Sequence, residues 1–195
     1  FQDKAGNILG KNTFRIFLTL NGCLAPLLIG TAVGTFFTGS QFLVNKNAVA
    51  DVVAPVISRW CNEWHGLEAV GNLFNVGFGL MVMLLAICLG ALYMINNIAH
   101  QALTLQLRRR LGQCFALFVP ILLIELFALF TMDGFAVDEA GVVSMQAGKY
   151  LHNLLQMPVV AAMFAIGAIL LLLGILLTLL KKQFNKGIWL AAPGT

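Results

Sequence analysis

The sequence predicts an all-α membrane protein, a polytopic bundle of transmembrane helices with four full spans and the start of a fifth. Its composition is the first indication, because 59% of the 195 residues are hydrophobic, only 10% are charged, and the mean hydropathy is +0.88. Soluble domains usually contain about a quarter of charged residues. The second indication is that the apolar residues are gathered into runs of about 20, the length needed to cross a hydrocarbon core.

Four segments of the chain meet that length requirement. They lie near residues 14–37, 73–95, 111–132 and 157–180. A fifth apolar segment starts at Gly187, in GIWLAAPGT. Pro26 and Pro120 fall inside the first and third spans. Neighbouring groups in a membrane bundle can satisfy the carbonyl that a proline frees, so these two positions predict kinks and not breaks.

The basic residues between the spans predict how the bundle is oriented. Two long connections, 38–72 and 133–156, alternate with two basic ones, 96–110 and 181–186. Nine basic residues fall on one side: Lys4, Lys11, Arg15, Arg108, Arg109, Arg110, Lys181, Lys182 and Lys186. Three fall on the other: Lys46, Arg59 and Lys149. The positive-inside rule places the nine in the cytoplasm, and both ends of the chain with them.

The acidic residues and two tryptophans fit the same orientation. Six acids lie in the two outer connections: Asp51, Glu63, Glu68, Asp133, Asp138 and Glu139. The outer stretch RWCNEWHGLEAV contains Trp60 and Trp64 directly before the second span. An amphipathic segment with tryptophans at this position predicts an interfacial helix lying at the lipid headgroups.

Small residues inside the spans predict close contacts between helices. Gly30 and Gly34 form a GxxxG pattern in the first span, which lets a second helix approach closely. Further glycines with the same implication lie in the first, second and fourth spans: Gly22, Gly77, Gly79, Gly90, Gly167 and Gly174. We therefore expect Gly30 and Gly34 to be helix-packing residues.

Glu125 lies in the middle of the apolar run VPILLIELFALF. It is about 10 Å inside the outer end of its span at 1.5 Å per residue, too deep for its short side chain to reach water. An unpaired, ionised carboxylate at that depth costs at least a few kcal/mol, so we expect Glu125 to face protein and to be either protonated or paired. A neutral Glu125 could bond to Thr31 in the first span or to a backbone carbonyl, or its partner could belong to a missing span or to another subunit. Both a structural role and a proton or quinone role remain open.

No active site is predicted within the chain. The three histidines, His65, His100 and His152, all fall outside the four spans, where they could not hold a haem in mid-membrane. Of the four cysteines only Cys61 is in a connection, and none has the spacing of a disulfide framework or zinc site. Hydrolase and nucleotide-binding motifs are missing. The net charge of +4 comes from short clusters beside the spans, which argues against a nucleic-acid partner.

The order and spacing of several segments resemble subunit II of the bacterial cytochrome bd ubiquinol oxidases. The resemblance runs from DKAGN through KNTFRIFLTLNGCLAPLLIGTAVGTFFTGSQF and NLFNVGFGLMVMLLAICLGALYMINNI to MDGFAV and LLQMPVVAAMFA. It covers most of the chain, although no single segment is diagnostic. It implies a multi-pass protein of the bacterial cytoplasmic membrane. We also expect the chain to be an interior fragment of a longer subunit, forming one membrane domain.

The resemblance implies a respiratory terminal oxidase that oxidises quinol and reduces oxygen to water. In that family the b-type and d-type haems and the quinol site belong to subunit I, and subunit II is a related bundle that packs on it. The expected partners are therefore subunit I, quinol or quinone, and membrane lipid, with no cofactor held by this chain alone and no catalytic residue assigned to it. Bound quinone is a further possibility.

A secondary transporter or permease is the alternative from a different functional class. Transporters have interrupted helices and polar groups at mid-depth. The candidates for such groups here are Asn21, Pro26 and Glu125. Co-purification with a haem-bearing partner would distinguish an oxidase subunit from a transporter.

Overall fold

A computed structural model describes residues 10–45, 57–137, 141–181 and 183–195. Within these ranges, four helices are long and apolar enough to cross a membrane. They are α1 (Gly10–Thr38), α2 (Leu73–Asn97), α3 (Gln101–Thr131) and α5 (Pro158–Leu180). The predicted all-α bundle is thus confirmed. Six residues that entered the prediction of orientation lie outside the described residues: Lys4, Lys46, Asp51, Asp138, Glu139 and Lys182.

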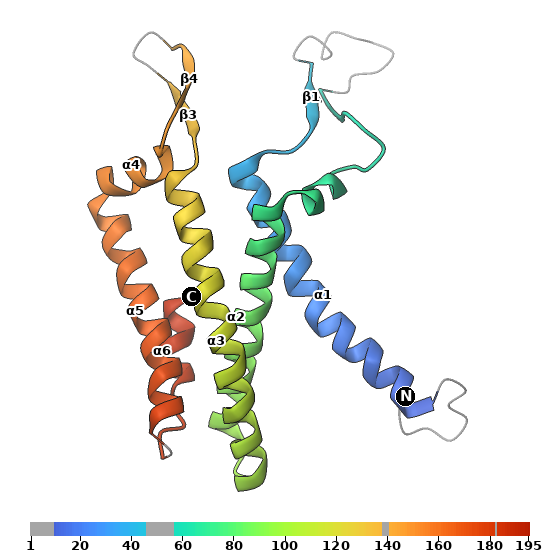
Figure 1. Cartoon of the computed structure of the whole chain (residues 1–195), viewed down its shortest axis with the longest axis vertical. Helices are drawn as coiled ribbons and strands as arrows, with labels where there is room; N and C mark the ends of the chain where they lie inside the picture. The colour runs from blue at the N-terminus through green and yellow to red at the C-terminus, as the bar shows by residue number, and fades with distance from the viewer. Residues whose placement is uncertain (1–9, 46–56, 138–140, 182) are drawn as a thin grey trace. The chain divides into compact units, whose positions relative to one another are not determined.

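The chain divides into two compact units, Phe1–Leu80 and Met81–Thr195, with the boundary inside α2. In the first unit, α1 is followed by a two-stranded antiparallel sheet of β1 (Phe42–Val44) and β2 (Ser58–Trp60), in which Phe42 is paired with Trp60. A 3₁₀ helix, η2 (Leu67–Gly71), then leads into α2 (Figure 1).

The predicted interfacial helix in RWCNEWHGLEAV is wrong as a continuous element. Its first residues belong to β2, and only its last residues enter η2. His65 and Gly66 interrupt it, because both have positive φ angles, 49° and 95°. Such angles cannot be part of a right-handed helix. Trp64 also lies in a turn, where its backbone N–H donates to Asn62 Oδ1 at 3.1 Å.

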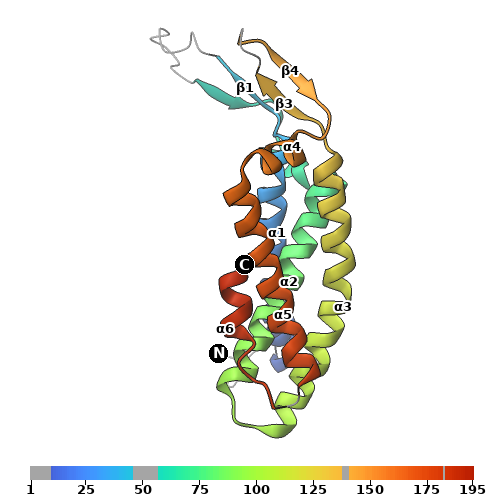
Figure 2. The same cartoon turned by 90° about the vertical axis from the view of Figure 1, so that its left-hand side faces the viewer.

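The second unit contains the remainder of α2, α3 and the C-terminal elements. After α3 come a hairpin of β3 (Gly134–Val137) and β4 (Val143–Gln146) and a short helix, α4 (Lys149–Gln156). Then follow α5, α6 (Ile188–Ala191) and the 3₁₀ helix η3 (Ala192–Gly194). Figure 2 shows α3 and α5 side by side and α6 folded back along α5. The apolar segment predicted to start a fifth span at Gly187 forms the two short helices α6 and η3 in the structure.

The core of this unit is formed by apolar side chains from α2, α3, α5 and α6. The fully buried ones are Cys88, Leu92, Ile95, Leu111, Phe118, Ile175 and Ala191. Leu111 and Phe118 are seven residues apart, a spacing of two helical turns that places them on one face of α3. This face defines the protein-facing side of the third span.

The predicted start of the third span changes in the structure. α3 begins at Gln101, so the arginines at 108–110, expected in a connection, lie on its second and third turns. The helix begins there because the side chain of His100 caps it, with Nδ1 accepting a hydrogen bond from Leu103 N at 3.2 Å. Both α1 and α3 continue without a break through Pro26 and Pro120, as predicted.

Paired glycines bring α6 and η3 against α5. A Cβ atom added to Gly174 would lie 2.6 Å from Gly187 O and 2.7 Å from Ala191 N. A Cβ added to Gly194 would lie 2.5 Å from Gly167 O. In each chain segment the two glycines are seven residues apart, so they line one face and meet their partners in antiparallel order. The backbones touch at both ends of this contact.

The side chain of Arg108 connects α3 to the end of α5. Its guanidinium donates hydrogen bonds to Phe184 O at 3.0 Å, Asn185 Oδ1 at 2.8 Å and Lys181 O at 3.3 Å, and also to Thr178 O. The last carbonyls of a helix have no partner within the helix, and they carry the negative end of its dipole. Arg108 therefore caps α5 and fixes the turn that leads to α6.

Candidate functional site

Glu125 lies on the buried face of α3. Its side chain is 8% exposed, and it follows Phe118 by the same seven-residue step that separates Phe118 from Leu111. Its Oε2 atom is buried and has no hydrogen-bond partner among the residues that the structure describes. The acid thus faces protein, at a depth where an unpaired charge would be costly. This arrangement favours the protonated, neutral form.

Thr31, one of the candidate partners for Glu125, has its own acceptor. Its hydroxyl donates to Leu27 O at 2.9 Å, within α1. A hydroxyl has a single proton to donate. Thr31 therefore has no second proton to give to an ionised carboxylate, and only its hydroxyl oxygen is left, as an acceptor for a protonated acid.

In the quinol oxidase complex that the sequence resemblance implies, we expect Glu125→Gln to leave turnover and its pH profile unchanged. Glutamine has the shape of the neutral acid and is also uncharged, but it cannot exchange a proton. The measurement is oxygen consumption with quinol as a function of pH. A flattened or displaced profile would instead assign Glu125 a role in proton transfer. Glu125→Leu should assemble less well, and equal yields would argue against a structural hydrogen bond.

The GxxxG glycines lie where α1 meets the first turns of α2. Gly30 and Gly34 are both buried. A Cβ added to Gly34 would lie 2.9 Å from the Cα atom of Asn75, so the backbones of α1 and α2 approach closely there. Gly79 makes the reciprocal contact from α2, since its added Cβ would lie 2.6 Å from Leu27 O. The pair of helices is in contact through glycines of both.

Asn75 is a polar residue at this contact that the sequence analysis did not single out. It is 1% exposed. Its Oδ1 accepts a hydrogen bond from the Thr38 hydroxyl at 2.9 Å, and its Nδ2 donates to Ala69 O at 3.2 Å. It thereby ties α1 to α2 and to η2. An asparagine in the first turn of an apolar span was the signal that could have identified it.

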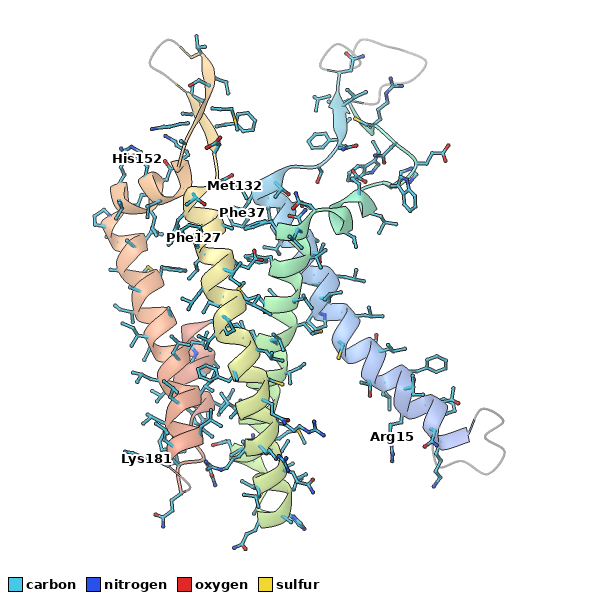
Figure 3. The ribbon with its side chains drawn as sticks, in the orientation of Figure 1. Arg15, Phe37, Phe127, Met132, His152 and Lys181 are labelled. Carbon is cyan, nitrogen blue, oxygen red and sulfur yellow. The ribbon has the colours of Figure 1, made fainter. Side chains whose placement is uncertain are left out.

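The three histidines lie apart from one another in sequence and outside the four long helices. His65 lies in the turn before η2, and His100 precedes α3, where its Nδ1 serves as the helix cap. Figure 3 shows His152 on α4, at the opposite end of α5 from Lys181. His152 Nε2 is 2.9 Å from Gln156 Nε2. All three lie outside the four long helices, and no cluster of possible metal ligands occurs among the described residues.

The four cysteines are free, and three of them, Cys23, Cys88 and Cys114, lie on the long helices. The described residues contain a buried acid, a polar helix contact and an arginine cap, all of which are features of a helix bundle. None of them is a complete catalytic group.

Comparison with known proteins places the chain in a family. No curated protein matches it at a significant level. A family model described as cytochrome bd terminal oxidase subunit II matches residues 1–194, nearly the whole chain. That match agrees with the segments on which the resemblance was based, and it gives no support to the transporter alternative. The chain belongs to the cytochrome bd terminal oxidase subunit II family.

Proposed function

We propose that the chain serves as the haem-free subunit of a quinol-oxidising, oxygen-reducing complex and that it packs on the haem-bearing subunit I. The observation that carries this proposal is the family match over residues 1–194. The b-type and d-type haems and the quinol site belong to subunit I in this proposal. The chain by itself is not catalytic.

The placement of the histidines supports this division of labour. Axial imidazoles are common ligands of haem iron in membrane oxidoreductases. His65, His100 and His152 all lie beyond the ends of the long helices, and His100 is already used as a cap. A haem buried in mid-membrane would therefore need its axial histidines from outside the described residues.

Exposed apolar surface supports a protein partner. Phe135 and Val137 of β3 lie opposite Met145 and Val143 of β4, and all four are at least 60% exposed. Alternate residues of a strand share a face, so these four form one apolar face of the hairpin. The hairpin extends beyond the end of α3 in both views (Figures 1 and 2). Hydrocarbon ends near the helix ends, so contact with a protein chain would best cover this face.

Purification of the chain with and without its partner tests the proposal. Expressed alone, the chain should show no Soret band and no oxygen reduction. Expressed with a subunit I, an affinity tag on this chain should recover a complex with haem absorbance. A Soret band from the isolated chain that disappears when His65, His100 or His152 is replaced would contradict the haem-free assignment.

We further propose that the protein is a multi-pass protein of the bacterial cytoplasmic membrane with both ends of the chain cytoplasmic. Cys61 is exposed and follows β2 on the expected outer side. A membrane-impermeant thiol reagent added from outside should therefore modify Cys61. In a Cys61→Ser background, Arg109→Cys should stay unmodified, because Arg109 is exposed and belongs to the connection expected on the cytoplasmic side. Labelling of that cysteine from outside would reverse the topology.

A further inference from the structure

The first unit contains a pocket of about 370 Å³ between α1 and the segment that carries β2 and η2. Leu28 and Ala32 of α1 form one wall, and Leu67 and Val70 of η2 contribute to the other. Ser40, Trp60 and His65 also line the pocket. Its size is within the range of about 300–1,000 Å³ that is typical of small-molecule sites.

An unusual turn shapes the outer wall of this pocket. His65 is the one non-glycine residue with a positive φ angle among those described, at 49°. Gly66 follows with φ at 95°, and its N–H donates to Glu68 Oε2 at 2.9 Å. A Cβ added to Gly66 would lie 2.9 Å from Trp60 Cη2, so the indole packs on the glycine backbone. Backbone in a sparsely populated conformation is often found where a ligand is held.

The lining is mostly apolar. Thr31 and Thr35 also contribute to it, but their hydroxyls donate to carbonyl oxygens of their own helix, Leu27 O at 2.9 Å and Ala32 O at 2.6 Å. None of the residues that line it carries a formal charge when histidine is neutral. Ser40 and His65 add a hydroxyl group and an imidazole ring to the lining. The pocket therefore suits a molecule with a long apolar part and uncharged oxygen acceptors.

The position of the pocket along α1 fits a membrane lipid. From Leu28 to Thr38, the last residue of α1, the helix rises by about 15 Å at 1.5 Å per residue. The apolar wall begins at the deeper end, and Ser40 lies just beyond the end of the helix. A phospholipid has the same sequence of groups along its length, from acyl chain to glycerol ester.

We propose that this pocket is a specific site for one phospholipid, with an acyl chain between Ala32 and Leu67 and the ester oxygens near Ser40 and His65. Ser40 and His65 would donate hydrogen bonds to these oxygens, and Trp60 would cover the chain near the headgroup. The proposal rests on the membrane location and on the complex proposed above, and otherwise only on residues of the first unit.

The test uses the purified oxidase complex in detergent. Native mass spectrometry should show one retained phospholipid, identified after extraction by its phosphate and fragment masses. Ala32→Phe fills the pocket and should remove this molecule. Ala25→Phe is the matched control: Ala25 is exposed on α1, two turns before Ala32 on the same face, and does not line the pocket. It should leave retention unchanged.

Ser40→Ala provides a second variant that changes no volume beyond one hydroxyl group, and it should weaken retention of the same lipid during detergent washing. Equal lipid retention in the wild type, Ala32→Phe and Ala25→Phe would overturn the proposal. So would a complex that retains no lipid. If the molecule lost from Ala32→Phe lacks phosphate and has quinone absorbance, the pocket is a quinone site and the lipid assignment is wrong.

Discussion

Replacing Arg108 with leucine should destabilise the assembled protein by at least about 3 kcal/mol, because several charged hydrogen bonds of about 1.5–3 kcal/mol each are lost. The acceptors include Thr178 O and Phe184 O, which belong to the end of α5 and to the turn after it. Thr178 is fully buried, so water cannot easily replace the lost donor. Thermal unfolding of the purified complex measures the effect.

Arg109→Leu is the matched control for this prediction. Arg109 is the next residue on α3 and is exposed, so its replacement removes one positive charge from the same region. It should change the midpoint of unfolding only slightly. Arg108→Lys should be intermediate, since an ammonium keeps the charge but cannot reproduce the planar set of donors. Equal effects at Arg108 and Arg109 would show that the charge matters and the cap does not.

Gly174→Ala should destabilise the protein by about 1–3 kcal/mol or more, the usual cost of inserting a methyl group into a filled contact. The new Cβ would lie 2.6 Å from Gly187 O and 2.7 Å from Ala191 N, which are backbone atoms that cannot rotate away. α6 would have to move off α5. The expected results are a lower midpoint of thermal unfolding and faster proteolysis after Leu180.

Gly90→Ala should not share the loss of stability predicted for Gly174→Ala. Gly90 is also inside a long apolar helix, but a Cβ added there meets no atom within 4 Å. Alanine favours helix by up to about 1 kcal/mol over glycine, so this variant should be neutral or slightly stabilised. Similar losses at Gly90 and Gly174 would mean that glycine flexibility, and not the α5–α6 contact, governs stability.

The four spans could be predicted from the sequence because their signal is local. An apolar run of about 20 residues is sufficient to indicate a transmembrane helix, whatever it packs against. The helices α1 and α3 therefore extend past the predicted spans without contradicting them. The prediction that the prolines do not break their helices also holds, since α1 and α3 continue through Pro26 and Pro120.

The short elements outside the spans could not be predicted in the same way. In the stretch RWCNEWHGLEAV the amphipathic pattern favoured a helix. A continuous right-handed helix does not form there, because His65 and Gly66 have positive φ angles. The strands β1 and β2 depend on pairing between residues on either side of a long connection. Their formation is decided by a contact that a local pattern does not contain.

By itself the sequence determined a membrane bundle with few charges, a buried acid at Glu125, and histidines placed outside the spans. The tertiary structure alone decided which small or polar residues meet. Glycines with similar spacing occur in several spans, but only the fold pairs Gly174 with Gly187 and leaves Gly90 in open space. Likewise, the guanidinium of Arg108 donates a hydrogen bond to the backbone oxygen of Thr178, which is 70 residues away in the sequence. The hydrophobicity of a span can be read from residues that are adjacent in the sequence. These contacts instead join segments that are far apart in the sequence and that only folding brings together.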